Sequence, residues 1–129
     1  MGISVFDEQF ADVNLLVFDS SNSPGTISFW TGDKTPRRVD AVLATNNDSI
    51  DHTIELRVNN GGSSTRIGSA VIPAGQGYAG TPGLNLLELV LPANVAGIVL
   101  DRFWTLDANC LVALTGSNGV FLTSLGGTF

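Results

Sequence analysis

The sequence is dominated by short runs in which apolar and polar residues alternate with a period of two. The clearest is IDHTIELRV, where Ile50, Ile54, Leu56 and Val58 share one face and mostly polar side chains occupy the other. Successive side chains of a strand point to opposite faces of a sheet. The run therefore predicts a half-buried β-strand with one face on a core and the other in water.

A second run, ADVNLLVF, is apolar on both faces. Val13, Leu15 and Val17 share one face, while Leu16 and Phe18 make the opposite face apolar as well. We read this run as a strand too.

Two further runs show the same alternation of apolar and polar residues less regularly. RRVDAVLAT alternates around Val39 and Leu43, and TRIGSAVI places Ile67, Ser69 and Val71 together on one face. Runs of similar character, GIVLDRFWTL, NCLVALTG and GVFLTSLG, follow toward the C-terminus.

Turn-forming residues separate these runs. Asn60-Gly61 and Asn118-Gly119 are hairpin signals, because Asn and Gly tolerate positive φ. Strands at this spacing predict an all-β fold, an antiparallel β-sandwich of jelly-roll or immunoglobulin-like type. The one short helix expected lies near residues 83–91, between Pro82 and Pro92, where the apolar run fits a two-turn helix or a buried strand equally well.

The 129 residues make one domain. We expect residues 1–9 to form a flexible N-terminal arm and residues 10–129 to form a single β-sandwich domain. One cysteine, Cys110, leaves no intramolecular disulfide, and its place in NCLVAL predicts a small buried apolar side chain. The N-terminus has no signal-peptide pattern, so we expect a protein that is not secreted by a cleaved signal.

The number and sign of the charged residues limit the classes of partner that the chain can bind. Twelve acidic against six basic residues give a net charge of −6, which argues against nucleic-acid binding through phosphates. No run approaches the length of a membrane span. Only 14% of residues are charged, below the usual value of about 25%. A small domain has much surface, so this low fraction favours a subunit whose surface is partly covered by partners.

Three glycines, Gly75, Gly77 and Gly80, match the G-x-G-x-x-G pattern of dinucleotide-binding proteins. That fingerprint requires a strand, a tight turn and a helix whose N-terminus meets the pyrophosphate. Here Pro82 and Pro92 confine any helix to a short segment, and the flanking runs read as antiparallel strands. We interpret the glycines as a long connection that crosses between sheets.

The residues do not favour catalysis or metal binding. His52, the only histidine, is in phase with Ile54 and Leu56, so we expect it to point toward the core. One Cys and one His do not make a usual zinc site. Asn46, Asp48 and Asp51 offer oxygens, but without the spacing of a calcium loop they predict a solvated turn. We predict no enzyme activity, no cofactor, no metal and no small-molecule substrate.

Four residues are candidates for a partner interface. Trp30 precedes a Thr-Gly-Asp turn, Gln76 and Tyr78 lie among the three glycines, and Phe129 ends the chain after a Gly-Gly pair. An apolar terminal residue of this kind can dock into a pocket on its own chain or on a neighbour.

The segment from Val39 to Phe129 resembles small β-sandwich virion proteins of tailed phages. The resemblance lies in VLATNNDSIDHTIELRV, IGSAVIPAGQGYAG, LLELVLP and the closing VFLTSLGGTF. It implies a capsid decoration (cement) protein that stabilises the phage head, forms a homotrimer and binds a major capsid protein, in a virion assembled in the host cytoplasm. A tail, neck or fibre accessory protein fits the same features.

A carbohydrate-binding β-sandwich module is the alternative from another class. Such a module needs exposed aromatic side chains, and Trp30, Tyr78 and Trp104 are the candidates.

Overall fold

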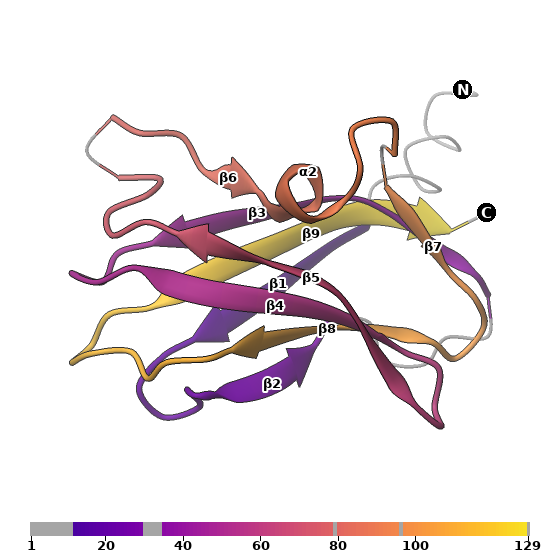
Figure 1. Cartoon of the computed structure of the whole chain (residues 1–129), viewed down its shortest axis with the longest axis horizontal. Helices are drawn as coiled ribbons and strands as arrows, with labels where there is room; N and C mark the ends of the chain where they lie inside the picture. The colour runs from indigo at the N-terminus through magenta and orange to yellow at the C-terminus, as the bar shows by residue number, and fades with distance from the viewer. Residues whose placement is uncertain (1–11, 30–34, 79, 96, 129) are drawn as a thin grey trace.

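The computed structural model describes residues 12–29, 35–78, 80–95 and 97–128. These residues form two antiparallel sheets packed face to face, with one short helix beside them (Figure 1). The strands are β1 (Asp12–Phe18), β2 (Gly25–Ser28), β3 (Arg37–Asn46), β4 (His52–Asn59), β5 (Ser64–Ile72), β6 (Leu84–Asn85), β7 (Ile98–Leu100), β8 (Thr105–Cys110) and β9 (Val120–Thr128). None of the helices in the described ranges has the length and apolarity that crossing a membrane requires.

The order of the strands identifies the type of sandwich. The five-stranded sheet runs β1-β9-β3-β6, with β7 also paired to β3, and the four-stranded sheet runs β2-β8-β4-β5. The chain changes sheet at nearly every connection; β4 and β5 form a hairpin within one sheet, and β6 and β7 both pair with β3. This interleaving is the jelly-roll arrangement rather than the immunoglobulin one. The predicted antiparallel β-sandwich is confirmed.

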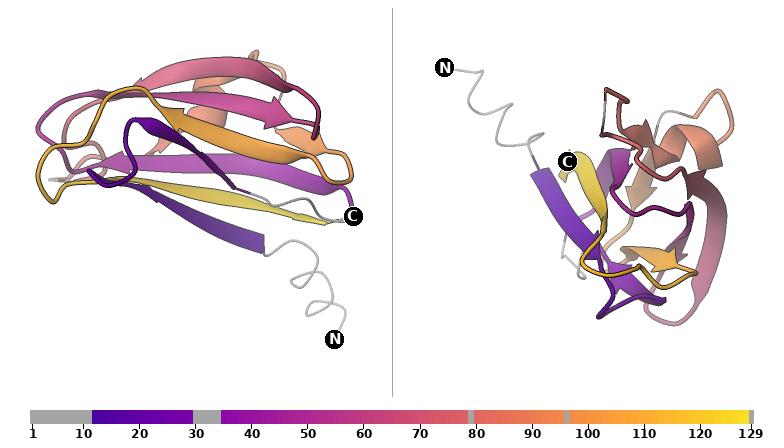
Figure 2. Two further views of the ribbon diagram at one scale, coloured as in Figure 1. Left: turned by 90° about the horizontal axis from the view of Figure 1, so that it is seen from below. Right: turned by 90° about the vertical axis from the view of Figure 1, so that its left-hand side faces the viewer.

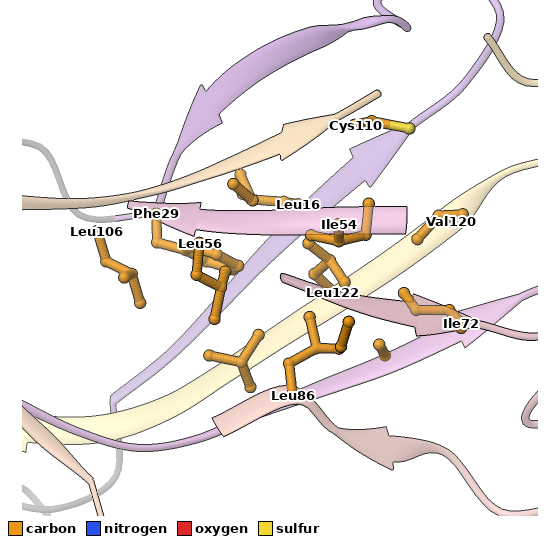
Figure 3. Packing of buried hydrophobic residues seen from close by; sticks show 14 of the residues in the cluster. Leu16, Phe29, Ile54, Leu56, Ile72, Leu86, Leu106, Cys110, Val120 and Leu122 are labelled. Carbon is orange, nitrogen blue, oxygen red and sulfur yellow. The ribbon is translucent and has the colours of Figure 1, made fainter. Parts of the chain in front are cut away.

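The core lies between the two sheets. Alternate residues of each strand point inward, as the period of two requires, and Figure 3 shows side chains from both sheets meeting there. The buried apolar cluster includes Leu16, Phe18, Phe29, Val42, Ile54, Leu56, Ile72, Leu106, Val120 and Leu122. His52 and Cys110 are fully buried as well, as their phase predicted.

The short apolar segment near residues 83–91 forms first a strand and then a helix. Leu84 and Asn85 pair with β3 as β6, and the chain then turns into helix α2 (Leu86–Val90). The side chain of Asn85 caps this helix by accepting a hydrogen bond from Leu87 N at 3.2 Å. The sequence left the choice between helix and strand open for residues 83–91, and the structure shows a two-residue strand followed by a five-residue helix.

Two β-bulges shift which residues reach the core. In β5, Ile67 has no partner because Leu56 pairs with Gly68 while Arg57 pairs with Arg66. Beyond this bulge the buried side chains are Ala70 and Ile72. Ile67 packs against the core whereas Val71 is exposed, so the prediction that Ile67, Ser69 and Val71 share one face is wrong.

The second bulge lies in β3 at Asp40. Val39 pairs with Gly126 and Ala41 with Leu125, so the inner residues after the bulge are Val42 and Ala44 and not Leu43. One further prediction was wrong. Ile50 lies in the turn before β4 and is exposed, because the strand begins at His52.

The glycine segment forms a connection between the two sheets, as predicted. Backbone hydrogen bonds from Gln76 N to Pro73 O, Tyr78 N to Gly75 O and Thr81 N to Tyr78 O make three successive turns between β5 and β6. Gly75, Gly77 and Gly80 all have positive φ, and the element that follows them is a strand. The strand–turn–helix geometry of a dinucleotide fingerprint is therefore not what these glycines build.

Candidate functional site

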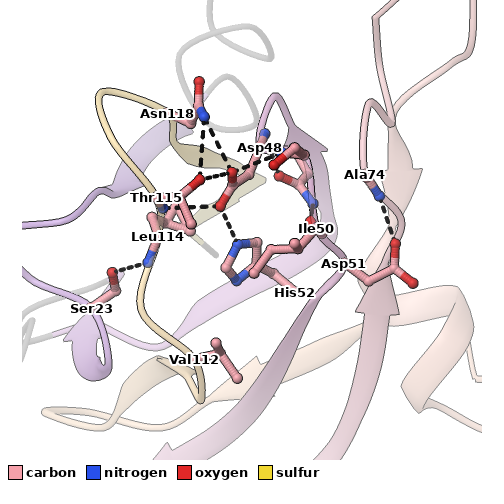
Figure 4. Close-up of polar contacts among 12 residues, drawn as sticks. Ser23, Asp48, Ile50, Asp51, His52, Ala74, Val112, Leu114, Thr115 and Asn118 are labelled. Atoms are coloured by element: carbon pink, nitrogen blue, oxygen red, sulfur yellow. Dashed lines mark hydrogen bonds and ion pairs between the residues drawn. The ribbon is translucent and has the colours of Figure 1, made fainter.

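A buried polar cluster closes one end of the sandwich, where the β3–β4 and β8–β9 connections meet (Figure 4). Asp48 lies in the first connection, His52 begins β4, and Thr115 and Asn118 lie in the second. The local sequence explains this burial. Asn46, the last residue of β3, and Asp48 just beyond it continue the inward phase of Val42 and Ala44.

The carboxylate of Asp48 accepts five hydrogen bonds. Oδ2 accepts from Nε2 of His52 at 2.8 Å and from Thr115 N at 3.1 Å. Oδ1 accepts from Ser49 N at 2.7 Å, from Nδ2 of Asn118 at 3.2 Å and from the hydroxyl of Thr115. The pKa of Asp48 reflects this arrangement. Burial alone would raise the pKa, but the hydrogen bonds from Thr115 and His52 outweigh it and hold the pKa far below its ordinary value of 3.8.

The cluster extends from His52 to a thiol. Nδ1 of His52 faces Sγ of Cys110 at 4.0 Å, so Cys110, His52 and Asp48 stand in the order nucleophile, base and orienting carboxylate. A catalytic thiol needs an exposed, acidified sulfur. Cys110 is instead fully buried, its thiol donates to Val112 O at 3.2 Å, and burial raises its pKa. The arrangement serves to anchor loops to the core.

The turn at residues 46–51 differs from its prediction. Asn46 and Asp48 are buried rather than solvated. Nδ2 of Asn46 donates to Ile50 O and Ile72 O, both at 3.0 Å, and Asp51 accepts from Ala74 N at 2.9 Å. Oδ1 of Asn46 accepts from Asp48 N at 2.8 Å, so this oxygen already has a protein partner. In the described ranges, no three His, Cys, Asp or Glu side chains gather in a way that could hold a metal ion.

A second feature is the outer surface of the five-stranded sheet. β1, β9 and β3 lie side by side there (Figure 2), and their register builds three cross-strand rows of outward residues. We call this surface the β1–β9–β3 face. Its rows are Val13–Leu125–Ala41, Leu15–Thr123–Leu43 and Val17–Phe121–Thr45.

The β1–β9–β3 face carries seven apolar residues, two threonines and no charge. Leu15 is 67% exposed and Val13 is 57% exposed. Val17, Leu43 and Phe121 are exposed as well. Single exposed apolar residues are ordinary, but a contiguous set is typical of an interaction surface.

The outer surface of the four-stranded sheet has the opposite character. Glu55 receives Arg57 Nη1 at 2.9 Å and Arg66 Nε at 3.2 Å, and hydrogen bonding from Arg57 lowers the pKa of this carboxyl. The outer surface of the four-stranded sheet therefore carries paired charges, whereas the three rows of the β1–β9–β3 face carry none; the nearest charges on that sheet are the ion pair of Arg38 and Asp40 at the other end of β3. Overall composition does not explain that difference.

The predicted interface residues fall into two groups. Trp30 and Phe129 lie outside the described residues. Gln76 is tied to its own chain, because its carbonyl accepts from Asn46 N at 2.9 Å and its side chain donates to Pro82 O. Tyr78 is exposed beside Gly77, which packs against Thr45 at the margin of the β1–β9–β3 face.

Comparisons with known proteins add little to this picture. No family model matches the sequence, and no curated protein matches it. Among solved structures, the chain is similar to the NLP-core of Drosophila, at 11% identity over 88% of this chain and 96% of that chain, with a TM-score of 0.48. The crystal structure of that protein concerns pentamer formation and histone binding. At this identity and TM-score, those properties remain statements about the Drosophila protein.

The fold and site define a jelly-roll β-sandwich with one apolar outer face. Jelly rolls host several functions, viral capsid and lectin domains among them, so the choice must come from the surface rather than from the fold.

Proposed function

We propose that the chain is a non-enzymatic structural subunit that self-associates through the β1–β9–β3 face and serves as a capsid decoration protein of a tailed phage. The observation that carries the assembly part is the uncharged grid of nine outward residues on β1, β9 and β3. Burial of apolar surface is the main driving force for association, and this face offers it without the cost of desolvating a charge.

The β1–β9–β3 face is smaller than a standard protein–protein interface, so other surfaces must contribute to self-association. Three strands about 4.8 Å apart and three rows of outward residues cover roughly 250 Å² in projection. A standard interface buries about 800 Å² per partner. We propose that the edge of β1, which pairs with no strand of the described residues on that side, and the loop around Tyr78, which adjoins the face at Thr45, supply part of the remainder.

The assignment to a phage head rests on the sequence resemblance of residues 39–129 to virion proteins. The buried thiol and the loop-anchoring role of the polar cluster support a structural rather than a catalytic role. In this proposal the partners are other copies of the chain, in a homotrimer, and a major capsid protein.

Immunogold electron microscopy tests the location. Antibodies raised against the chain are applied to intact virions of the phage that encodes it and to lysates lacking virions. Labelling distributed over the head supports decoration. Label confined to the neck, tail or fibres replaces it with an accessory role there, and virions without label contradict the proposal.

A further inference from the structure

Two consecutive aromatic side chains project from the β7–β8 turn, at the end of the sandwich opposite the polar cluster. Phe103 is 57% exposed and Trp104 is 36% exposed. Trp104 N donates to Asp101 O at 3.1 Å, and this turn holds Phe103 at a φ of 63°, which bulky residues rarely adopt. Residues held in sparsely populated φ/ψ regions cluster at functional sites, so this turn is a candidate binding element.

A groove of about 320 Å³ lies beside Trp104. Its other walls come from the β4–β5 hairpin, whose tip lies at the same end of the molecule as the β7–β8 turn (Figure 1, Figure 2). We call it the Trp104 groove. It is lined by Val58, Asn60, Ser63, Thr65, Ile67 and Trp104.

The lining of the Trp104 groove is amphipathic and uncharged. Val58, Ile67 and Trp104 supply apolar surface, and the hairpin supplies an amide and two hydroxyl groups. Because no ionisable side chain lines the groove, a phosphorylated or carboxylated ligand would meet no counter-charge there.

The polar side chains of the groove keep unused hydrogen-bonding groups among the described residues. Oδ1 of Asn60 accepts from Gly62 N and Ser63 N, both at 2.9 Å, which fixes the side-chain amide. Its Nδ2 has no protein partner among the described residues, and neither do the hydroxyls of Ser63 and Thr65. A positioned donor and two hydroxyls therefore remain available beside an indole ring.

We propose that the Trp104 groove binds a neutral pyranose ring of a glycan. A pyranose combines an apolar C–H face, which stacks on an aromatic ring, with a rim of hydroxyls that donate and accept hydrogen bonds. The apolar lining of the groove matches the C–H face of the sugar, and its amide and hydroxyl groups match the hydroxyl rim. A purely apolar peptide side chain would use the indole but would leave the amide and hydroxyls unpaired, which lowers affinity.

This groove is independent of the assembly surface. It is built by the four-stranded sheet and the β7–β8 turn, whereas self-association is assigned to the outer surface of β1, β9 and β3. A failure of one proposal therefore does not affect the other. Leu15→Glu, a substitution designed to disrupt self-association through the β1–β9–β3 face, should leave sugar binding unchanged.

A glycan array of neutral and acidic oligosaccharides, followed by calorimetry with the best neutral binder, tests the proposal on the full chain. Trp104→Ala should lower affinity at least about tenfold through loss of the stacking ring. Thr65→Val keeps the shape and removes one hydroxyl, so it should weaken sugar binding about fivefold. Val99→Ala, on exposed β7 outside the groove, is the matched control and should change nothing.

Thr65→Val also distinguishes a sugar from an apolar peptide, whose binding it would leave unchanged or strengthen. Circular dichroism of each variant checks the fold, and Trp104→Leu, which keeps apolar bulk but removes the aromatic ring, provides a second test should Trp104→Ala not fold. The proposal is overturned if the array shows no neutral binder, if only acidic glycans bind, or if a folded Trp104→Ala or Trp104→Leu protein binds as the wild type does.

Discussion

Nε2 of His52 donates a hydrogen bond to Oδ2 of Asp48 at 2.8 Å, with both side chains closed off from solvent. A carboxylate only accepts, so the hydrogen between them lies on the histidine. Asp48 also receives Thr115 and Asn118 from the β8–β9 connection. One buried carboxylate thus links the β3–β4 and β8–β9 connections, since Thr115 and Asn118 lie 67 and 70 residues after Asp48 in the sequence.

Replacing Asp48 should destabilise the fold strongly. Asp48→Ala leaves the buried donors of His52 and Thr115 unpaired, which should lower the free energy of unfolding by about 3 kcal/mol. The control is Asp51→Ala, because Asp51 is exposed and accepts a hydrogen bond from Ala74 N; this change should cost about 1 kcal/mol or less. Urea unfolding of both variants measures the difference. Equal losses would show that the cluster has no special role.

Stability should fall in acid because of the same residue. The pKa of Asp48 is lower in the folded state than its ordinary value of 3.8, so the folded protein resists protonation. The stabilisation is complete above about pH 5 and is lost as the pH falls through 3.8 toward the lower folded-state pKa. Unfolding measured between pH 7 and pH 3 should show this loss, with a shallower slope for Asp48→Asn. Parallel slopes for the two proteins would exclude Asp48 as the main cause.

Gly126 should tolerate no larger side chain. It pairs with Asp12 on one side and Val39 on the other, and an added Cβ would lie 1.9 Å from the carbonyl oxygen of Arg38. Since that oxygen belongs to the backbone, relief requires β3 or β9 to move. Gly126→Ala should therefore lower the melting temperature by about 10 °C, corresponding to roughly 3 kcal/mol.

Gly62 provides the control for this substitution. It lies in the exposed β4–β5 turn, and a Cβ there meets its nearest neighbour, Oδ1 of Asn60, at an ordinary 3.7 Å. Gly62→Ala should change the melting temperature by no more than about 2 °C. A Gly126→Ala protein that melts with the wild type would mean that β3 and β9 are less closely fixed than their pairing indicates.

Removing residues 126–129 should also weaken the fold. Gly126, Gly127 and Thr128 extend β9 as a central strand, and Thr128 pairs with Arg37 of β3. The truncated chain loses ladder hydrogen bonds in the middle of a sheet, so we expect a lower melting temperature. Deletion of Phe129 alone is the control, because it distinguishes the contribution of the terminal residue to stability from that of strand residues 126–128. A truncated chain with unchanged melting and unchanged oligomer size would refute the expectation.

Local patterns in the sequence predicted the fold class because buried and exposed positions alternate along a sandwich strand, and this alternation is visible in the sequence of the strand itself. The alternation of Ile54 and Leu56 predicted both β4 and the burial of His52, and Asn60-Gly61 indicated the β4–β5 hairpin. The hairpin predicted at Asn118-Gly119 was wrong, because β8 and β9 belong to different sheets. The alternation failed at Ile67 and Asp40, where a bulge changes the phase. A bulge depends on the register with the neighbouring strand, which local sequence does not encode.

The polar cluster could be predicted only in part. The burial of His52 followed from its phase with Ile54 and Leu56, but that of Asn46 and Asp48 was not predictable, because the phase that they share with Val42 and Ala44 is set by the bulge at Asp40. Their partners in the β8–β9 connection were not predictable, because only the folded topology brings that connection next to the β3–β4 turn. The apolar character of both faces of β1 was visible from the start, but its continuation across β9 and β3 depends on strand order.

Self-association through the β1–β9–β3 face is the central claim, and size-exclusion chromatography with light scattering tests it most directly. The wild type should elute as a closed oligomer, a trimer. Leu15→Glu, which places a charge in the middle row of the face, should elute as a folded monomer. Val71→Glu, at an exposed strand position of the other sheet, should retain the wild-type size. A wild type that is monomeric at every concentration, or a Leu15→Glu protein that keeps the wild-type oligomer, would contradict the claim.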